Sequence, residues 1–563
     1  MKLSLGTKAV ARNSKNSLDV LFKSEQIQLE KGRFHQVTQF KSGDSHFFLF
    51  GVIHAVNTGG LYEKINHRSN DSQNNLLSKV FGNLPLEKAI ISCEGHFMGV
   101  QITSNQELTL FGDSCGRIEV FYVEQDGEIV ATESLDRLVT EERSKGYDQT
   151  ALINLLGIYG NYAPKQQTIY KGIKRLGVGQ RIIFSNGKVS YENESFTPEK
   201  TQEYGNEKLE EYYEIFRSAV EIRSSDEMNW VCMSSGWDSS SILAMLNHIH
   251  GPKKIRCAIM RMQYSDRSGY NNDFEIKRAK QITDFYDVPL DIVDVNYSSP
   301  EFNDFWSSIR NDFKAQHIYG LYPYNFYKLN NYISKHATPR SSVFNGETSD
   351  GSHNFGFSQF ATILDHPDLG FREYSDKMAS YLFGPSFFES IQNGKAKDDL
   401  IYKLLADQKG DGHIDIEKMS KKDNWKIDYA LSFLCSAKRL PFSELGNTGM
   451  LTDRGMEKYR NEIGESYLKE FNDTATSENI YSWFAHLYNS FYWQGSNIKG
   501  VMTSPGYNDL SVAAPFWDNR MQSFLSVMPE SWAHGLELHP TKCPLKWMLR
   551  NKIKSPLDPQ VGP

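Results

Sequence analysis

The sequence predicts an α+β N-terminal domain built as a β-sandwich, followed by an α/β domain with a helical C-terminal extension. Three observations predict this class. The chain of 563 residues is too long for a single core. Its apolar pattern changes near residues 196–206 from short strand-like runs to alternating strands and helices, and beyond about residue 370 the strand signals fade. We therefore expect one domain over residues 1–195 and a second over residues 207–563.

Composition limits the kinds of molecule that this protein is expected to bind. The net charge is −7 and no basic block occurs, which argues against binding a nucleic-acid backbone. No run of about 18 apolar residues predicts a membrane span, and the N-terminus lacks the apolar core of a signal peptide. The six cysteines have no metal-like CxxC spacing, which is typical of free thiols in a reducing cytoplasm. We therefore expect a cytoplasmic protein that contacts neither nucleic acid nor membrane.

The first 195 residues contain apolar runs of about five residues, rich in β-branched and aromatic side chains. Examples are HFFLFGVIHAV, AIISCEGHFMGVQI, LTLFGDSCG and QRIIFSNGKVSYE. QDGE and SNGK are typical of tight hairpin turns. This pattern predicts a largely antiparallel sheet.

The polar stretch FTPEKTQEYGN, residues 196–206, is predicted to be a linker. After it, helical spacing in KLEEYYEIFRSAVEIRSS alternates with the strand-like runs NWVCMSS, KIRCAIM and LDIVDV, as expected of βαβ units around a parallel sheet. Further on, DNWKIDYALSFLCSAKRL and ENIYSWFAHLYNSFYWQG predict helices.

The segment NWVCMSSGWDSSSILAML, residues 229–246, carries the strongest chemical signal. An apolar strand runs through small residues into a helix, so backbone amides and the helix N-terminus can approach an anion closely. No lysine of the P-loop pattern is present. The sequence predicts a pyrophosphate cradle; a serine-rich helix cap without a ligand is the alternative.

This segment resembles the SGGxDSS loop of N-type ATP pyrophosphatases, which cleave ATP between the α and β phosphates, with Ser235 in place of the first glycine. The resemblance implies that ATP is bound by the following residues: Val231, Met233, Ser234, Ser235, Gly236, Asp238, Ser239, Ser240 and Gly346.

A second segment, FNGETSDG at residues 344–351, is similar to the pattern Gly-Glu-x-x-Asp-Glu of the same enzymes. The resemblance implies that Asp350 and Asp238 bind Mg²⁺, and two carboxylates facing a triphosphate suit that cation. It also makes Glu347 a candidate general base, because a partly desolvated carboxyl group acquires a raised pKa. A helix-capping or surface-loop glutamate is the alternative. Gly351 replaces the usual second acid.

Five ordered matches, including Glu275, APFWDNRMQSFLSVMP (514–529) and KWMLR (546–550), resemble the synthetase part of the asparagine synthetase family. Upstream, EGHF (94–97), DSCGR (113–117) and TIYKGIKRLGVG (168–179) resemble its class II glutamine amidotransferase part. The resemblance covers nearly the whole chain and implies these two folds for the two predicted domains.

The sequence departs from that family at two places. Glutaminase activity there requires an N-terminal cysteine, but this sequence begins Met-Lys-Leu, and Cys93 lies within a predicted strand, where a small buried side chain is expected. β-Lactam synthetases and lasso-peptide cyclases also lack that cysteine. Secondly, the family's catalytic Arg-x-Lys pattern is not found after Arg550. Truncation, substitution by Lys552 or Lys554, and an impaired second step all remain open.

Together these features predict an ATP- and Mg²⁺-dependent ligase that adenylates a small-molecule or peptide carboxylate and transfers the acyl group to an amine, without glutaminase activity. A catalytically weak nucleotide-binding scaffold of the same fold is the alternative, and another ATP-pyrophosphatase reaction is a third. The sequence does not identify either substrate, and it leaves homodimer formation open. The aromatic segment HIYGLYPYNFYKLNNYI, residues 317–333, fits core packing better than a substrate pocket.

Overall fold

The structure is a computed structural model. It describes residues 2–5, 19–24, 26–31, 37–65, 70–125, 128–139, 146–157, 166–338, 341–354, 381–410, 414–434, 440–442, 452–492, 496–508, 510–534 and 542–557.

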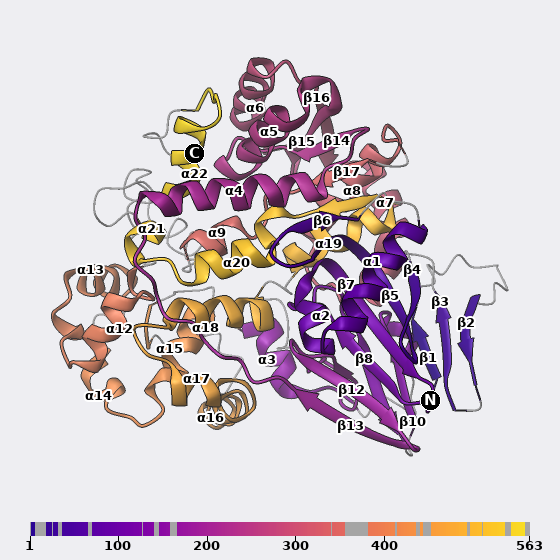
Figure 1. Ribbon diagram of the computed structural model, residues 1–563. Coiled ribbons are helices and arrows are strands. Elements are labelled where there is room, and N and C mark those ends of the chain that lie inside the picture. The colour runs from indigo at the N-terminus through magenta and orange to yellow at the C-terminus, as the bar shows by residue number, and fades with distance from the viewer. Residues whose placement is uncertain are drawn as a thin grey trace.

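Two sheets form the N-terminal part (Figure 1). The first contains β1 (Lys2–Leu5), β2 (Asp19–Lys23), β3 (Gln28–Lys31), β9 (Phe121–Gln125), β10 (Glu128–Thr132) and β11 (Lys174–Arg175). The second contains β4 (Val37–Ser42), β5 (Ser45–Asn57), β6 (Tyr62–Lys64), β7 (Cys93–Thr103), β8 (Leu108–Gly112), β12 (Gln180–Ser185) and β13 (Lys188–Asn193).

The two sheets pack face to face as a sandwich. One buried cluster joins Leu29 and Tyr122 of the first sheet to Phe50, Val100 and Ile182 of the second. The second sheet is antiparallel throughout its described pairings. In the first sheet, however, β1 pairs in parallel with both β3 and β10. The prediction of a largely antiparallel sandwich is therefore confirmed, with one parallel strand inserted.

Helices cover the outer face of the second sheet, where a separate apolar cluster joins it to α1 and α2. The helical elements of this part are α1 (Asn70–Asn83), α2 (Leu86–Ser92), η1 (Leu135–Arg137) and α3 (Gln149–Gly157). The run AIISCEGHFMGVQI was predicted as one strand, but its first four residues end α2 and only Cys93 onward is β7. A short apolar run does not distinguish a buried helix from a strand.

The hairpin predictions are confirmed. β9 pairs with β10, and β12 with β13, in antiparallel register. In the second hairpin Asn186 has φ 52° and Gly187 has φ 74°. Positive φ at both central residues is the type I′ turn that Asn-Gly favours, because neither residue is strongly penalised there.

No helix or strand occurs between β13 and α4 (Asn206–Arg223), where the linker was predicted. This segment is nevertheless bound to the body of the protein. The amide of Thr201 donates to the Glu478 carbonyl (2.6 Å) and that of Gln202 to the Val527 carbonyl (2.8 Å).

A parallel sheet forms the second part, in the order β16-β15-β14-β17-β18. Its strands are β14 (Asn229–Cys232), β15 (Ile255–Gln263), β16 (Leu290–Asn296), β17 (Ser342–Phe344) and β18 (Ser511–Ala513), and every pairing is parallel. The order reverses between β14 and β17. The carboxyl ends of two such strands diverge into a crevice, which is where open α/β sheets bind ligands.

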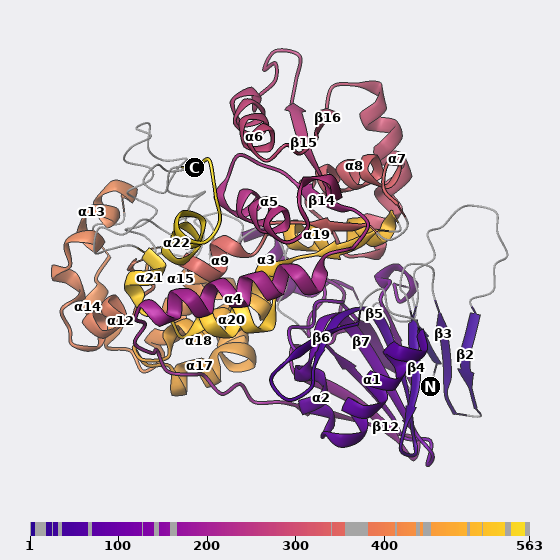
Figure 2. The same cartoon turned by 45° about the horizontal axis from the view of Figure 1, so that its top comes forward.

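Helices cover both faces of this sheet (Figure 2). Consecutive residues of β14 face opposite ways: Val231 packs into the large core with α5, whereas Trp230 packs with Leu329 of α8. The elements around the sheet are α4, α5 (Trp237–His250), η2 (Pro252–Lys254), α6 (Asp273–Phe285), α7 (Pro300–Ala315), α8 (Pro323–Ser334), α9 (Ser349–Asn354), α19 (Ser496–Tyr507), η6 (Pro515–Trp517), α20 (Asn519–Ser526), α21 (Glu530–His534) and α22 (Cys543–Asn551).

The remaining helices form a group on the other side of α4 from the parallel sheet (Figure 1). They are α12 (Pro385–Gln392), η3 (Ala396–Asp398), α13 (Leu400–Lys409), α14 (Ile416–Ser420), α15 (Trp425–Leu434), α16 (Asp453–Ile463), the π-turn η4 (Gly464–Leu468), α17 (Lys469–Thr474), α18 (Ile480–Leu487) and the π-turn η5 (Tyr488–Tyr492). The helices predicted beyond about residue 370 are thus present, but they do not end the chain, which returns to the parallel sheet as strand β18.

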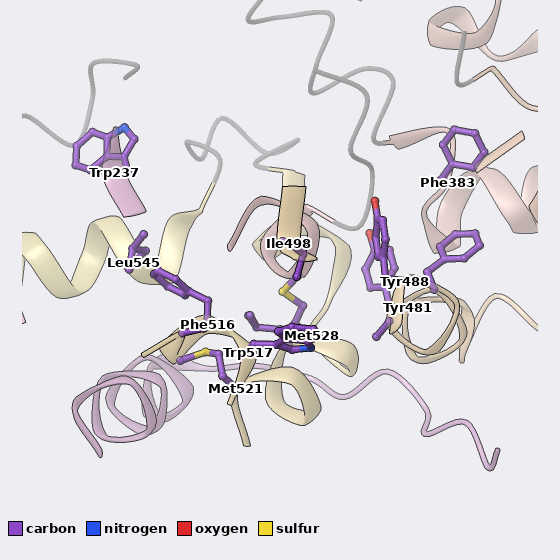
Figure 3. Packing of buried hydrophobic residues seen from close by; sticks show 14 of the residues in the cluster. Trp237, Phe383, Tyr481, Tyr488, Ile498, Phe516, Trp517, Met521, Met528 and Leu545 are labelled. Carbon is purple, nitrogen blue, oxygen red and sulfur yellow. The ribbon is translucent and has the colours of Figure 1, made fainter. Parts of the chain in front are cut away.

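One apolar core links this helical group to the parallel sheet. It runs from Phe383 and Tyr481 through Trp517 and Phe516 to Trp237 at the start of α5 (Figure 3). In its helical half the rings of Phe433 and Phe484 stack with centroids 3.8 Å apart. The helix that follows the predicted serine loop is therefore anchored in the largest core of the described residues.

The described residues contain no helix long and apolar enough to cross a bilayer. They also contain no group of three or more His, Cys, Asp or Glu side chains arranged to hold a metal ion.

Candidate active site at the crevice between β14 and β17

The serine loop leaves β14 and enters α5 at the crevice. The Ser239 hydroxyl accepts from the amide of Ser234 (3.0 Å), and the Ser234 hydroxyl accepts from the amide of Gly236 (3.1 Å). Gly236 is the N-cap of α5, and no side chain caps the helix. An uncapped helix N-terminus presents amides and partial positive charge, the combination that binds phosphate.

The loop after β17 lies directly against this helix start. A Cβ atom on Gly346 would lie 2.9 Å from Cβ of Asp238 and 3.2 Å from the amide nitrogen of Ser239, so glycine is needed for this approach. Thr348 has φ 73°, which is strained for a β-branched residue. With this backbone conformation the chain turns at Thr348 and enters α9, which carries Asp350 toward Asp238.

Three acidic side chains and one lysine meet here. The Lys542 ammonium donates to both carboxylate oxygens of Asp238, at 2.8 Å each, and also contacts Oδ1 of Asp350. The Lys542 side chain is 10% exposed, compared with 21% for Asp238 and 31% for Asp350. Two carboxylates from different elements thus converge on one cation.

Asp238 is supported by a series of hydrogen-bonded residues, Ser349, His353 and Tyr212. The Ser349 hydroxyl donates to Oδ1 of Asp238 (2.7 Å). His353 Nδ1 lies 2.8 Å from the Ser349 carbonyl, which can only accept, so this nitrogen carries the proton. Nε2 then accepts from the Tyr212 hydroxyl (2.8 Å). Burial lowers the pKa of His353 to about 3, so its ring stays neutral and the orientation of Asp238 is fixed.

The electrostatics separate Glu347 from its neighbours. Burial, and after it the carboxylates of Asp350 and Asp238, raise the pKa of Glu347 to about 7. Burial also raises the pKa of Asp238, opposed by Lys542. The pKa of Lys542 is raised well above its usual value by Asp238 and Asp350, so it remains an ammonium. At neutral pH, therefore, Glu347 is present in both its protonated and its ionised form.

The pair Asp238 and Asp350 fits a divalent cation. The Lys542 ammonium stands in for one, because it contacts carboxylate oxygens of both residues at once. Oxygen ligands suit Mg²⁺, which usually takes one or two carboxylates and completes its shell with water and phosphate oxygens.

The structure brings together most of the predicted site residues, but not all. Ser234, Gly236, Asp238 and Gly346 lie at the crevice, and Ser235 is 7% exposed in the same loop. The site residues at the start of α5, Ser239 and Ser240, are buried behind the loop, and Ser240 donates to the Gly236 carbonyl (2.7 Å). Met233 lies at the end of β14 and is 5% exposed, whereas Val231 is 0% exposed within the sheet. Val231 therefore has no surface for a ligand in this conformation.

Lys542 was missed by the sequence analysis, which considered Lys552 and Lys554 as replacements for the family lysine. In the structure Lys552 pairs with Glu210 (2.6 Å), and the Lys554 ammonium lies over the ring of Phe285 (5.6 Å). Lys542 precedes the matched KWMLR motif by four residues and is the N-cap of α22. An isolated lysine outside any motif gives no sequence signal.

The matched residues 546–550 lie in α22. Lys546 is 4% exposed, and its ammonium lies 4.9 Å from the centre of the Trp237 ring in the serine loop. This contact ties α22 to the start of α5, and it places Lys542, one turn earlier, beside the carboxylates.

The amidotransferase-like motifs occupy the contact between the N-terminal sandwich and the second part. Arg223 of α4 binds Glu94 of β7 (2.5 Å) and Asp518 (2.8 Å). Arg117 binds Asp113 (3.3 Å) and donates to the Trp517 carbonyl (2.5 Å). Because all five side chains are buried, the turn and strand that carry the resemblance form an interface.

The aromatic segment of residues 317–333 is divided between core and surface. Tyr324, Phe326 and Tyr327 are buried, as predicted, whereas Tyr319 and Tyr322 are 44% and 46% exposed. The Tyr322 hydroxyl interacts electrostatically with the Glu347 carboxylate, which lies nearby. Part of this segment therefore borders the site.

Comparisons with known proteins add little. No family model matches the sequence, and no curated protein matches it. Among solved structures, one match is a glutamine-dependent NAD+ synthetase from Acinetobacter baumannii in complex with ADP. It shares 12% identity with a TM-score of 0.19, and the match covers 47% of this chain and 63% of that one. At so low a score the likeness supports no argument, and the function is inferred from the geometry of the chain itself.

Proposed function

We propose that this protein is an AMP-forming carboxylate–amine ligase. It would bind ATP at the serine loop, join a substrate carboxylate to the α-phosphorus with release of pyrophosphate, and transfer the acyl group to an amine. The substrates would be small molecules or peptides in the cytoplasm.

One observation carries this proposal. The uncapped start of α5 and three carboxyl groups, those of Asp238, Glu347 and Asp350, meet at the point where the strand order reverses. An isolated carboxylate cluster would repel a triphosphate. Combined with helix amides and the Lys542 ammonium, the same cluster suits a triphosphate that carries its own divalent cation.

The described side chains have distinct parts in this reaction. The amides after Ser234 would bind the phosphates, and Asp238, fixed by Ser349, would keep the phosphate-bound cation in register with them. Asp238 and Asp350 would hold Mg²⁺, which supplies electrostatic neutralisation of the phosphate oxygens. Orientation of this kind lowers a barrier because the groups are positioned before the reaction begins.

Glu347 would take the proton from the attacking amine. A base with a pKa of about 7 is present partly as carboxylate at neutral pH and is basic enough to accept a proton. Burial, and after it the neighbours Asp350 and Asp238, raise this pKa, so the residues that would bind the cation also affect the base.

The described cysteines of the N-terminal part support the absence of glutaminase activity. Cys93 and Cys115 are 1% and 8% exposed, and burial raises the pKa of both thiols. A buried thiol with a raised pKa is a poor nucleophile at neutral pH.

Exchange of radiolabelled pyrophosphate into ATP tests the proposal. Pools of carboxylic acids would be screened with Mg²⁺, using the wild-type protein and Asp238→Ala. We expect exchange that depends on one acid and is lost in the variant. ATP binding without exchange in any pool would contradict the proposal.

One observation favours the second candidate, a nucleotide-binding scaffold with weak catalysis. Lys542 already contacts oxygen atoms of both carboxylates that would bind the metal. The same screen separates the candidates, because a scaffold binds ATP without supporting exchange.

A further inference from the structure

The position of Lys542 raises a question that the proposed function leaves unanswered. Its ammonium contacts both carboxylates at the place where a divalent cation would lie. A lysine and a metal ion cannot both occupy that position, because each needs the same oxygen atoms and like charges repel at short distance. The two must therefore alternate or exclude one another.

We propose that Lys542 is the resting counter-ion of the Asp238–Asp350 pair, and that a divalent cation enters the site only when this ammonium is displaced. The inference rests on the proposed function for the identity of the metal-bearing substrate. It does not depend on which acid or amine is used.

The energetics support displacement rather than permanent blockage. Two neighbouring carboxylates, one of them largely buried, would be costly without a counter-charge. Lys542 supplies a single positive charge to a pair with two negative charges, so the pair stays one charge short of neutrality. A divalent ion neutralises the pair completely, and the phosphates that arrive with it would give the released ammonium a new partner.

The backbone permits such a movement. Lys542 is the N-cap of α22 and has φ 58°, a left-handed conformation that is uncommon outside glycine, asparagine and aspartate. The side chain therefore extends from the residue that precedes α22, and not from a regular turn of that helix. A change at this one residue could withdraw the ammonium while the contact between Lys546 and Trp237 keeps α22 in place.

Binding of Mn²⁺ to the full chain without nucleotide tests the inference directly. Electron paramagnetic resonance would measure free Mn²⁺ in titrations of the wild type, Lys542→Met, Lys552→Met and the double variant Lys542→Met/Asp238→Asn. We expect Lys542→Met to bind Mn²⁺ at least about tenfold more tightly than wild type, because a competing unit charge has gone. The double variant should lose this gain.

Lys552→Met is the matched control. It removes the same charge from the same segment, but Lys552 pairs with Glu210 and not with the site. An equal gain in Lys552→Met, no gain in Lys542→Met, or a gain that persists in the double variant would each overturn the inference.

A second measurement uses the wild-type protein, in case Lys542→Met does not fold. Acetylation by an amine-reactive ester, followed by mass spectrometry, would compare lysines in the folded protein. We expect Lys542 to react at least about tenfold more slowly than Lys552, since its ammonium is held by two carboxylates and its side chain is 10% exposed, compared with 30% for Lys552. Equal rates would overturn the inference.

Neither measurement contains ATP or a substrate, so they fail independently of the ligase proposal. A gain of Mn²⁺ binding in Lys542→Met with no pyrophosphate exchange in the wild type would keep the counter-ion role and reject the ligase. Pyrophosphate exchange in the wild type, with no gain of Mn²⁺ binding in Lys542→Met, would keep the ligase and reject the counter-ion role.

Discussion

Two clusters of acidic side chains differ in how their charge is balanced. At the contact between the sandwich and α4, the carboxylates of Glu94, Asp113 and Asp518 are buried against arginines. At the crevice, three acids share one lysine, Lys542. The first cluster is neutralised within the protein, whereas the second keeps an excess of negative charge.

The pKa shifts follow this difference at Asp518 and Glu347, but not at Glu94, whose pKa is raised by burial and then by Asp518. Although burial acts against it, the arginines Arg223 and Arg520 hold the pKa of Asp518 below its usual range. In the crevice burial dominates, and the pKa of Glu347 rises to about 7. Balanced buried charges contribute to structure, while unbalanced ones are available for a ligand.

The largest expected effect would come from breaking the balanced cluster. Arg223→Met leaves Glu94 and Asp518 buried without their shared partner, which should cost about 3–5 kcal/mol. The midpoint of urea unfolding would measure it. Arg217→Met on the same helix removes exposed pairs with Glu214 and Glu221 and should cost less than about 1 kcal/mol. Similar losses of stability in Arg223→Met and Arg217→Met would show that burial does not determine how much these ion pairs contribute.

The next largest effect concerns the unbalanced cluster. Asp238→Asn should reduce pyrophosphate exchange about 100-fold or more, since it removes a carboxylate that would hold the phosphate-bound cation. Circular dichroism should show an intact fold. Asp291→Asn, which breaks a partly exposed pair with Arg256, is the control and should leave exchange unchanged. Loss of folding in Asp238→Asn would make this cluster structural, like the first.

Glu347→Gln should separate the two halves of the reaction. Exchange should persist, because adenylation does not need the base, while amide formation should fall about 100-fold or more. In the wild type, amide formation should rise with pH through about 7, following the pKa of Glu347. An unchanged pH profile in Glu347→Gln would exclude this carboxyl group as the base.

The same substitution has an effect on stability. The folded pKa of about 7 exceeds the ordinary value of 4.5, so folding favours the protonated form. That contribution is fully present below pH 4.5 and is lost as pH rises through 7. Above pH 7, Glu347→Gln should therefore be more stable than wild type by on the order of 2 kcal/mol, with no difference at low pH. Urea unfolding at two pH values would check the sign.

The smallest effect is expected at Cys93. Cys93→Ala removes one buried sulfur atom, which should cost about 1 kcal/mol, and it should leave exchange and amide formation unchanged. Thermal unfolding and the exchange assay would measure both. Loss of activity in a folded Cys93→Ala variant would show that the N-terminal sandwich also takes part in the reaction.

The sequence predicted what local patterns determine. Short apolar runs rich in β-branched and aromatic residues, together with the Asn186–Gly187 turn, predicted the antiparallel sheet, and alternating strands and helices predicted the parallel sheet. The resemblance to N-type ATP pyrophosphatases implied that Asp238 and Asp350 act together, and in the structure Lys542 contacts both. The helical start of AIISCEGHFMGVQI was missed, because apolarity alone does not distinguish a buried helix from a strand.

The sequence could not predict contacts made by residues distant along the chain. Lys542 meets Asp238 across 304 positions and belongs to no motif. The clamp of Arg223 on Glu94 and Asp518 likewise joins three segments whose proximity only the fold determines. For the same reason, the pKa of Glu347 depends on burial and on neighbouring charges that no local pattern reveals.

Attack of the substrate carboxylate on the α-phosphorus of ATP is the step that defines the proposed ligase. Once the exchange screen has identified the acid, the acid labelled with oxygen-18 in its carboxyl group would be incubated with ATP, Mg²⁺ and the amine. Mass spectrometry would then locate the label. We expect one labelled oxygen in AMP and unlabelled pyrophosphate. Label in inorganic phosphate with formation of ADP, or no transfer of label, would contradict the proposed reaction.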